Sequence, residues 1–130
     1  MKKKSRKGVA MLKAKGRTGT KPPGAPNKTE AEYMTVLEVR KAAGEIARWW
    51  FERYTLTLSH SRPGVKGQRY TPDFAVQLPD GEIEFHEIKG FRDEKNMNKL
   101  KMAGELFPHT FRLVTRRLKR DGGGFDVVAY

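Results

Sequence analysis

The chain has 130 residues, no cysteine and a formal net charge of +12. A chain of this length is expected to form one domain with a modest core, and the missing cysteines exclude a fold held together by disulfides. No apolar run approaches the length that crosses a membrane, and residues 8–12 are too short for the apolar segment of a secretory signal. These features predict a cytoplasmic protein without a membrane partner.

Positive charge is concentrated at the start of the chain. Residues 1–29 hold ten of the 27 lysines and arginines and no acidic residue, so residues 30–130 carry 17 basic against 15 acidic side chains. We therefore expect residues 1–26 to form a disordered basic arm that binds nucleic-acid phosphates, and residues 27–130 to form one folded domain. The arm residues expected to contact nucleic acid are Lys2, Lys3, Lys4, Arg6 and Lys7. A solubilising tail or an RNA contact of the ribosomal type is the alternative.

The first predicted element is a helix over residues 28–43. Thr29 and Glu32 fit a capping box, and Gly44 is a natural stop. Apolar residues at helical spacing form its inward side: Tyr33, Met34, Val36, Leu37 and Val39. Glu30 lies at the N-terminal end of this inward stripe, from where it can approach a sheet. The alternative is that Glu30 only adds favourable charge at a helix N-terminus.

An aromatic-rich segment follows, and we expect one strand from Ile46 to Leu58 whose aromatic side chains fill the core. Residues 59–69 contain one proline and two glycines, which predicts a loop. The loop carries three basic side chains and no acidic one: Arg62, Lys66 and Arg69. It either holds a DNA backbone or is an ordinary solvated loop.

A Pro-Asp-Gly turn at residues 78–81 separates two predicted strands. These strands are expected at residues 70–78 and 82–90. In a three-residue loop Leu78 pairs with Glu82, and the same register places Asp73 opposite Glu87. Their Cβ atoms would then lie about 5 Å apart, which is unfavourable for like charges unless a cation binds between them.

Strand alternation decides which neighbours share the face of Glu87. Lys89 lies two residues further and shares it, whereas His86 points to the opposite face and is expected to be structural. Carboxylate oxygens suit Mg²⁺ or Mn²⁺, and the cysteines or paired histidines that zinc prefers are missing here. We therefore expect Mg²⁺ or Mn²⁺ as cofactor, bound by Asp73 and Glu87.

The remaining elements complete an α/β fold. We expect a helix at residues 94–107, a strand at 111–118 and a short final strand at 125–130. Three lysines of the helix face either phosphates or solvent: Lys95, Lys99 and Lys101. The predicted order is α-β-β-β-α-β with a terminal strand, forming a central mixed sheet flanked by helices.

Pro72-Asp73 followed by Glu87-Ile88-Lys89 resembles the motif of the PD-(D/E)XK nuclease superfamily. Residues 70–74, with the Glu-x-Lys-Gly ending, are especially similar to small phage-encoded endonucleases and junction-resolving enzymes. The family usually adds a glutamate near the start of the helix before the sheet, and Glu30 follows Asn27-Lys28-Thr29 in that place. The resemblance covers residues 27 to about 115 and implies a restriction-endonuclease-like αβββαβ core.

The resemblance also implies a role for each site residue. The metal ligands would be Asp73, Glu87, the backbone carbonyl of Ile88, and Glu30. Lys89 would position or deprotonate the attacking water, or stabilise the developing negative charge. The catalytic set implied is Glu30, Asp73, Glu87 and Lys89.

The expected function is a Mg²⁺- or Mn²⁺-dependent DNA endonuclease of phage or prophage origin, acting in the cytoplasm of a bacterial host. Branched DNA such as a Holliday junction is one candidate substrate. A catalytically inactive nucleic-acid-binding module on the same fold and a basic structural protein are the alternatives. Monomer and homodimer are both left open.

Overall fold

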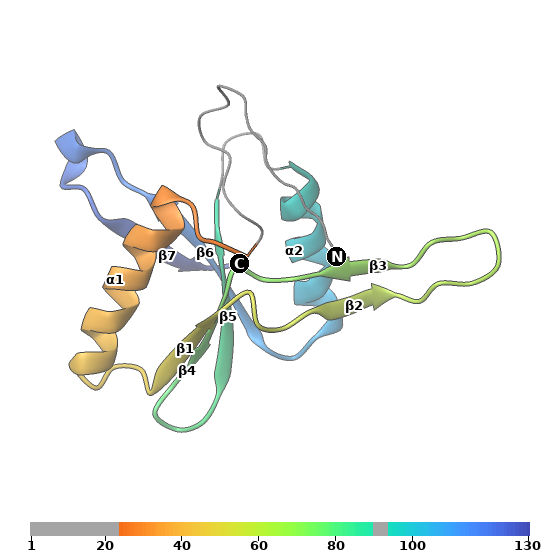
Figure 1. Cartoon of the computed structure of the whole chain (residues 1–130), viewed down its shortest axis with the longest axis horizontal. Helices are drawn as coiled ribbons and strands as arrows, with labels where there is room; N and C mark the ends of the chain where they lie inside the picture. Colours follow the sequence, from red (N-terminus) through yellow and green to blue (C-terminus); the bar gives the residue numbers. More distant parts are fainter. Residues whose placement is uncertain (1–23, 90–93) are drawn as a thin grey trace, which may run out of the picture.

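The computed structural model describes residues 24–89 and 94–130, so nearly all of the expected basic arm lies outside the described residues. A five-stranded sheet in the order β1-β4-β5-β6-β7 forms the centre, and a two-stranded ribbon, β2-β3, projects beside it (Figure 1). The strands are β1 Arg48–Phe51, β2 Leu56–Ser59, β3 Gln68–Tyr70, β4 Phe74–Gln77, β5 Ile83–Ile88, β6 Thr110–Arg116 and β7 Phe125–Ala129. The helices are α1 Lys28–Ala42, α2 Glu94–Leu106 and the short 3-10 helix η1 Lys119–Asp121.

Over residues 24–89 and 94–130, no helix combines the length and apolar character that crossing a membrane requires.

The sheet is mixed, which confirms the predicted α/β class. β1, β4 and β5 are antiparallel neighbours, β5 and β6 run parallel, and β7 is antiparallel to β6. α2 is the crossover connection that two parallel strands require. With the β2-β3 ribbon set aside, the elements follow the chain as α1, β1, β4, β5, α2, β6 and β7.

Two apolar clusters pack on the two faces of the sheet. The cluster under α1 contains Tyr33, Leu37, Ile46, Phe74, Val76, Ile88 and Val114. The cluster under α2 contains Leu58, Tyr70, Ala75, Phe85, Leu100, Ala103 and Phe111. Successive residues of β4 alternate between the two clusters, as strand geometry requires. The sheet therefore lies between α1 and α2, with the β2-β3 ribbon on the α2 side.

The single strand expected at residues 46–58 is wrong. The chain leaves the main sheet after Phe51, and β2 pairs instead with β3 in the separate ribbon. Glu52, at the break, has a φ of 49°, a left-handed conformation that strand residues do not adopt. Residues 52–55 contain neither glycine nor proline, so the sequence carries no turn signal at this point.

The predicted loop and the strand after it are also corrected. The loop at residues 59–69 ends earlier, because residues 68–70 form β3. The strand expected at residues 70–78 begins only at Phe74. Pro72 separates the two strands, since a proline nitrogen cannot donate a ladder hydrogen bond.

The capping box of α1 lies two residues earlier than predicted. The Asn27 side chain accepts a hydrogen bond from the Glu30 backbone N–H at 2.8 Å, and the Asn27 N–H donates to Glu30 Oε1 at 2.8 Å. Asparagine is at least as good an N-cap as threonine, so Asn27 is preferred where both are available. Thr29 and Glu32, the pair expected to form the box, instead contact Arg116.

The predicted register of the β4-β5 hairpin is confirmed. The Leu78 N–H donates to the Glu82 carbonyl at 2.8 Å, and the strands pair as the three-residue loop requires. Gly81 has a φ of 96°, the left-handed conformation that closes such a turn. One step beyond the last pair, this register places Asp73 opposite Glu87.

Candidate metal site

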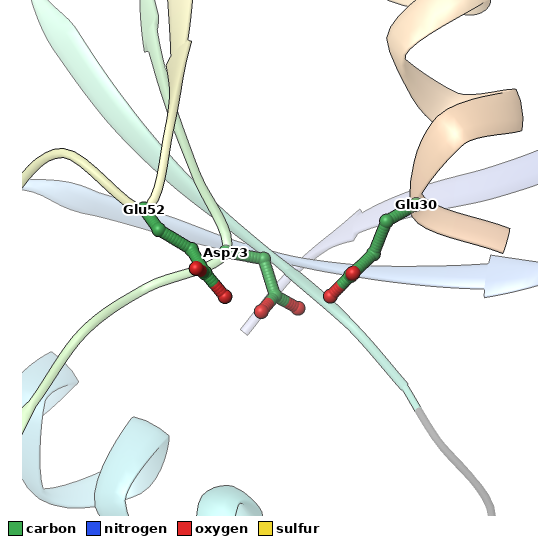
Figure 2. A group of neighbouring side chains, drawn as sticks. All are labelled: Glu30, Glu52 and Asp73. Atoms are coloured by element: carbon green, nitrogen blue, oxygen red, sulfur yellow. The ribbon is translucent and has the colours of Figure 1, made fainter. Parts of the chain in front are cut away.

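Three carboxylates meet at one end of the main sheet. One oxygen from each of Glu30, Glu52 and Asp73 lies within 4.8 Å of the other two, and Figure 2 shows the three side chains pointing toward one another. Glu30 comes from the first turn of α1, Glu52 directly follows β1, and Asp73 directly precedes β4. Several converging carboxylate oxygens are the donors that hard cations such as Mg²⁺ and Mn²⁺ prefer. The residues present therefore fit the expected cofactor.

Glu30 reaches this group because the helix cap holds it there. Its carboxylate accepts the Asn27 N–H in the capping box, and the residue is buried. The positive end of the α1 dipole adds favourable interaction for a carboxylate in the first turn. The structure thus brings Glu30 to Asp73, which is the first of the two interpretations that the sequence left open for this residue.

Glu52 is the member of the group that the sequence did not indicate. β1 and β4 pair Phe51 with Phe74, and one step further the Glu52 N–H donates to the Asp73 carbonyl at 2.9 Å. A left-handed conformation costs a non-glycine residue of order 1–3 kcal/mol, so its surroundings must support it. The signal that could have found Glu52 is this strand pairing, which puts the acid after β1 beside the acid before β4.

Asp73 and Glu87 are joined through the backbone. Asp73 Oδ2 accepts a hydrogen bond from the Ile88 N–H at 2.9 Å, and Glu87 Oε1 lies 3.3 Å from the Asp73 nitrogen that donates to it. The Tyr70 hydroxyl donates to the same Glu87 oxygen at 2.6 Å, and Glu87 is only 2% exposed. The predicted pair is therefore together, but the close group of three contains Glu52 in place of Glu87.

Ile88 and Lys89 lie at the end of β5. The Ile88 side chain is part of the core under α1, so its contribution to an ion could come only from the backbone. Lys89 directly follows the strand, its side chain is exposed, and its N–H donates to the Val114 carbonyl at 2.8 Å. The roles assigned to both residues stay predictions.

The basic residues expected to bind nucleic acid fall into two groups. Those of the arm, Lys2, Lys3, Lys4, Arg6 and Lys7, lie outside the described residues. Those of the predicted loop lie in the β2-β3 ribbon. Arg62 forms an isolated bridge with Val65, whereas Lys66 and Arg69 line a groove against α2.

A second polar network lies under α1, on the face of the sheet opposite to the Glu87 side chain. The Tyr33 hydroxyl lies 2.7 Å from His86 Nδ1, His86 Nε2 lies 3.1 Å from Glu84, and Arg112 donates to Glu84 at 3.0 Å. Burial lowers the pKa of His86, and the hydrogen bond with His86 lowers the pKa of Glu84 to about 2. Burial also raises the pKa of Tyr33 to about 12. A neutral His86 with its proton on Nε2 satisfies both of its neighbours, as its predicted structural role requires.

This network predicts that the fold loses stability in acid. Folding lowers the pKa of His86 from 6.5 and that of Glu84 from 4.5, so the unfolded chain binds more protons as the pH falls. Their contribution is complete above about pH 6.5 and is lost progressively below it. We expect the melting temperature in EDTA to fall from pH 7 to pH 4. In His86→Gln the melting temperature should depend less on pH near pH 6.

The control is His60→Gln, which changes an exposed histidine. A His86→Gln profile parallel to wild type would contradict the interpretation.

A scan against protein families matches residues 25–122 to the family described as "Protein of unknown function (DUF1064)". The matched range is most of the chain and contains every carboxylate of the site. Neither the search of curated proteins nor that of solved structures found a match.

Proposed function

We propose that this chain, which belongs to the DUF1064 family, is a Mg²⁺- or Mn²⁺-dependent endonuclease that hydrolyses phosphodiester bonds in DNA. One observation carries the proposal: Glu30, Glu52 and Asp73, from three separate segments of the chain, converge beside a fourth carboxylate, Glu87. Carboxylates so arranged repel one another, and burying two of them adds a desolvation cost. A divalent cation removes both costs, which favours a metal site over a chance cluster.

The order of the elements supports the same proposal. Apart from the ribbon and β7, the chain follows the α-β-β-β-α-β order of the restriction-endonuclease-like core that the resemblance to PD-(D/E)XK nucleases implies. On that interpretation Asp73 and Glu87 are the two acids of the motif and Lys89 is its lysine. The β2-β3 ribbon is then an insertion between the first two strands of the core, and β7 is an addition at its end.

The proposed chemistry depends on which residues would bind the divalent ion. Glu30, Glu52 and Asp73 would bind the ion, while Glu87 and the Ile88 carbonyl would complete its surroundings. A bound divalent ion lowers the pKa of a coordinated water and neutralises charge on the phosphate.

Two hydrogen bonds would keep the carboxylates in place during the reaction. Tyr70 orients Glu87, and the Ile88 N–H orients Asp73, so neither side chain has to rearrange when a phosphate arrives. Lys89 would act from the exposed end of β5, by orienting the attacking water or stabilising the negative charge that develops on the phosphate oxygens.

The direct test is to incubate the purified protein with supercoiled plasmid and with a synthetic four-way junction. Cleavage is expected in Mg²⁺ or Mn²⁺ and not in EDTA, and preferential cutting of the junction would assign branched DNA as the substrate. An Asp73→Ala protein purified in parallel controls for contaminating nuclease. Failure to cut either DNA in both metals would contradict the proposal.

The basic arm should contribute affinity and not chemistry. Deleting residues 1–25 removes nine lysines and arginines, and each lost phosphate contact should lower the slope of log affinity against log salt by about 0.9 for duplex DNA. We expect weaker binding to every DNA sequence and an almost unchanged melting temperature, because α1 begins at Lys28. Fluorescence anisotropy over a range of salt concentrations and thermal melting check both. An unchanged slope, or an unfolded truncated protein, would refute the assignment of the arm.

A further inference from the structure

We propose that the groove between the β2-β3 ribbon and α2 binds the phosphate backbone of the DNA substrate and does not distinguish its bases. The inference rests on the proposed function and adds the path along which the substrate approaches the carboxylates. It depends on the charge of the groove, on its connection to the site and on the chemistry of its lining.

The groove has a volume of about 940 Å³ and is basic on both walls. The basic residues of the ribbon wall are Lys66 and Arg69, and those of the α2 wall are Lys95, Lys99 and Lys101. Glu105 is the one acidic residue among the described lining residues. Lys95 and Lys99 are four residues apart on one helix, a spacing at which like charges are destabilising. A polyanion in the groove would offset this repulsion.

The two walls are held in place by the core. Leu100 and Ala103 of α2 pack in one cluster with Leu58 of β2 and Tyr70 of β3. Figure 1 shows the ribbon crossing α2, and the shared cluster places the two in contact. The core therefore fixes α2 and the strands of the ribbon relative to each other, which favours binding of a backbone between the two walls.

The ribbon wall is directly connected to the metal site. Asp73 comes only four positions after Arg69, so their Cα atoms are at most about 14 Å apart. Between them, the Tyr70 hydroxyl donates to Glu87. With a rise of about 3.4 Å per base pair, this Cα separation corresponds to at most about four base pairs of duplex.

The lining favours contact with phosphates over contact with bases. Sites for unpaired bases offer aromatic side chains for stacking, and none of the described residues that line the groove is aromatic. Lysine ammonium groups bind phosphates as point charges and carry little sequence information. Binding through this groove should therefore depend strongly on salt and weakly on sequence.

The test compares two double charge reversals in the full-length protein. Lys66→Glu with Lys95→Glu changes two exposed residues of the groove, and Lys119→Glu with Arg120→Glu changes two exposed residues of η1 by the same net charge. Affinity for two duplexes of unrelated sequence is measured in EDTA by fluorescence anisotropy over a range of salt concentrations. For two phosphate contacts, the groove variant should lower the salt slope by about 1.8, equally for both duplexes, while the η1 variant keeps the wild-type slope.

Several outcomes would overturn the proposal: equal losses in both double variants, no loss in the groove variant, or a loss confined to one duplex. Polyglutamate serves as a second probe, and a groove variant that loses polyglutamate binding but keeps DNA binding would assign the groove to an acidic protein instead. If the groove charge reversal lowers the melting temperature, the double variant Lys66→Gln with Lys95→Gln is used in its place. This variant should change the salt slope by a smaller amount. If wild type cuts no DNA and the groove variant still shows the reduced slope, the groove assignment stands and the endonuclease proposal fails.

Discussion

Replacing Asp73 with alanine is expected to abolish DNA cleavage while leaving the protein folded. Asp73 belongs to the group of three carboxylates and is also hydrogen-bonded to the backbone of β5. Losing a metal ligand should lower the rate by more than about 100-fold, the upper end of what loss of an outer-shell partner costs. The rate is measured on supercoiled plasmid in Mg²⁺ with enzyme in excess.

The same substitution should change stability in a way that depends on metal. Removing one of several adjacent negative charges should raise the melting temperature in EDTA, but alanine also leaves the Ile88 N–H without this acceptor, so the rise should be larger for Asp73→Asn than for Asp73→Ala. In both variants the increase that Mg²⁺ gives to the wild type should shrink. Asp73→Asn tests the charge alone, because an amide oxygen can still accept the Ile88 N–H. Asp121→Asn, which neutralises an exposed acid of η1, is the control and should keep wild-type behaviour. A wild-type melting temperature that responds to neither Mg²⁺ nor Mn²⁺ would count against a metal site.

Glu87→Ala should also abolish cleavage, but its effect on stability should be opposite. The buried Tyr70 hydroxyl loses its acceptor, which costs about 1–3 kcal/mol. Glu87→Gln keeps an oxygen for Tyr70 while removing the charge, so it should melt at a higher temperature than Glu87→Ala. Cleavage by either variant at the wild-type rate would remove Glu87 from the site.

Local signals explain which parts of the fold could be predicted. The turn at residues 78–81 determines the register of the β4-β5 hairpin, since loop length dictates which residues pair. That register is enough to place Asp73 opposite Glu87. Helical spacing likewise placed Glu30 where it could approach the sheet, because three- and four-residue steps lead from it to buried Tyr33 and Leu37, but it left favourable charge at the helix N-terminus as an equal alternative.

Pairing between distant segments explains what the sequence did not reveal. Glu52 joins the site only because β1 pairs with β4, and no local pattern specifies that partner. The break after Phe51 depends on a left-handed glutamate, a conformation that sequence rules assign to glycine or asparagine. The continuous run of β-forming residues therefore concealed both the β2-β3 ribbon and the groove that it forms with α2.

Substituting Lys89 distinguishes an enzyme from a binding module, and it should also have a large effect on the cleavage rate. If Lys89 acts on the attacking water or on the transition state, Lys89→Ala should lower the cleavage rate by at least about 100-fold. DNA binding in Ca²⁺ should stay within about twofold of wild type, because an interaction made only in the transition state changes the rate and not ground-state affinity. Cleavage in Mg²⁺ and binding in Ca²⁺ are measured on the same preparation.

The exposed position of Lys89 makes this comparison interpretable. Its side chain lies beyond the buried end of β5, so removing it leaves no cavity in the core and should leave the melting temperature unchanged. Lys41→Ala, at an exposed lysine in the last turn of α1, is the matched control and should keep both binding and cleavage. In a catalytically inactive module Lys89 would be one more phosphate contact, and its loss would lower affinity with no cleavage to lose. A fall in affinity that accounts for the whole fall in cleavage would therefore remove the catalytic role proposed for Lys89.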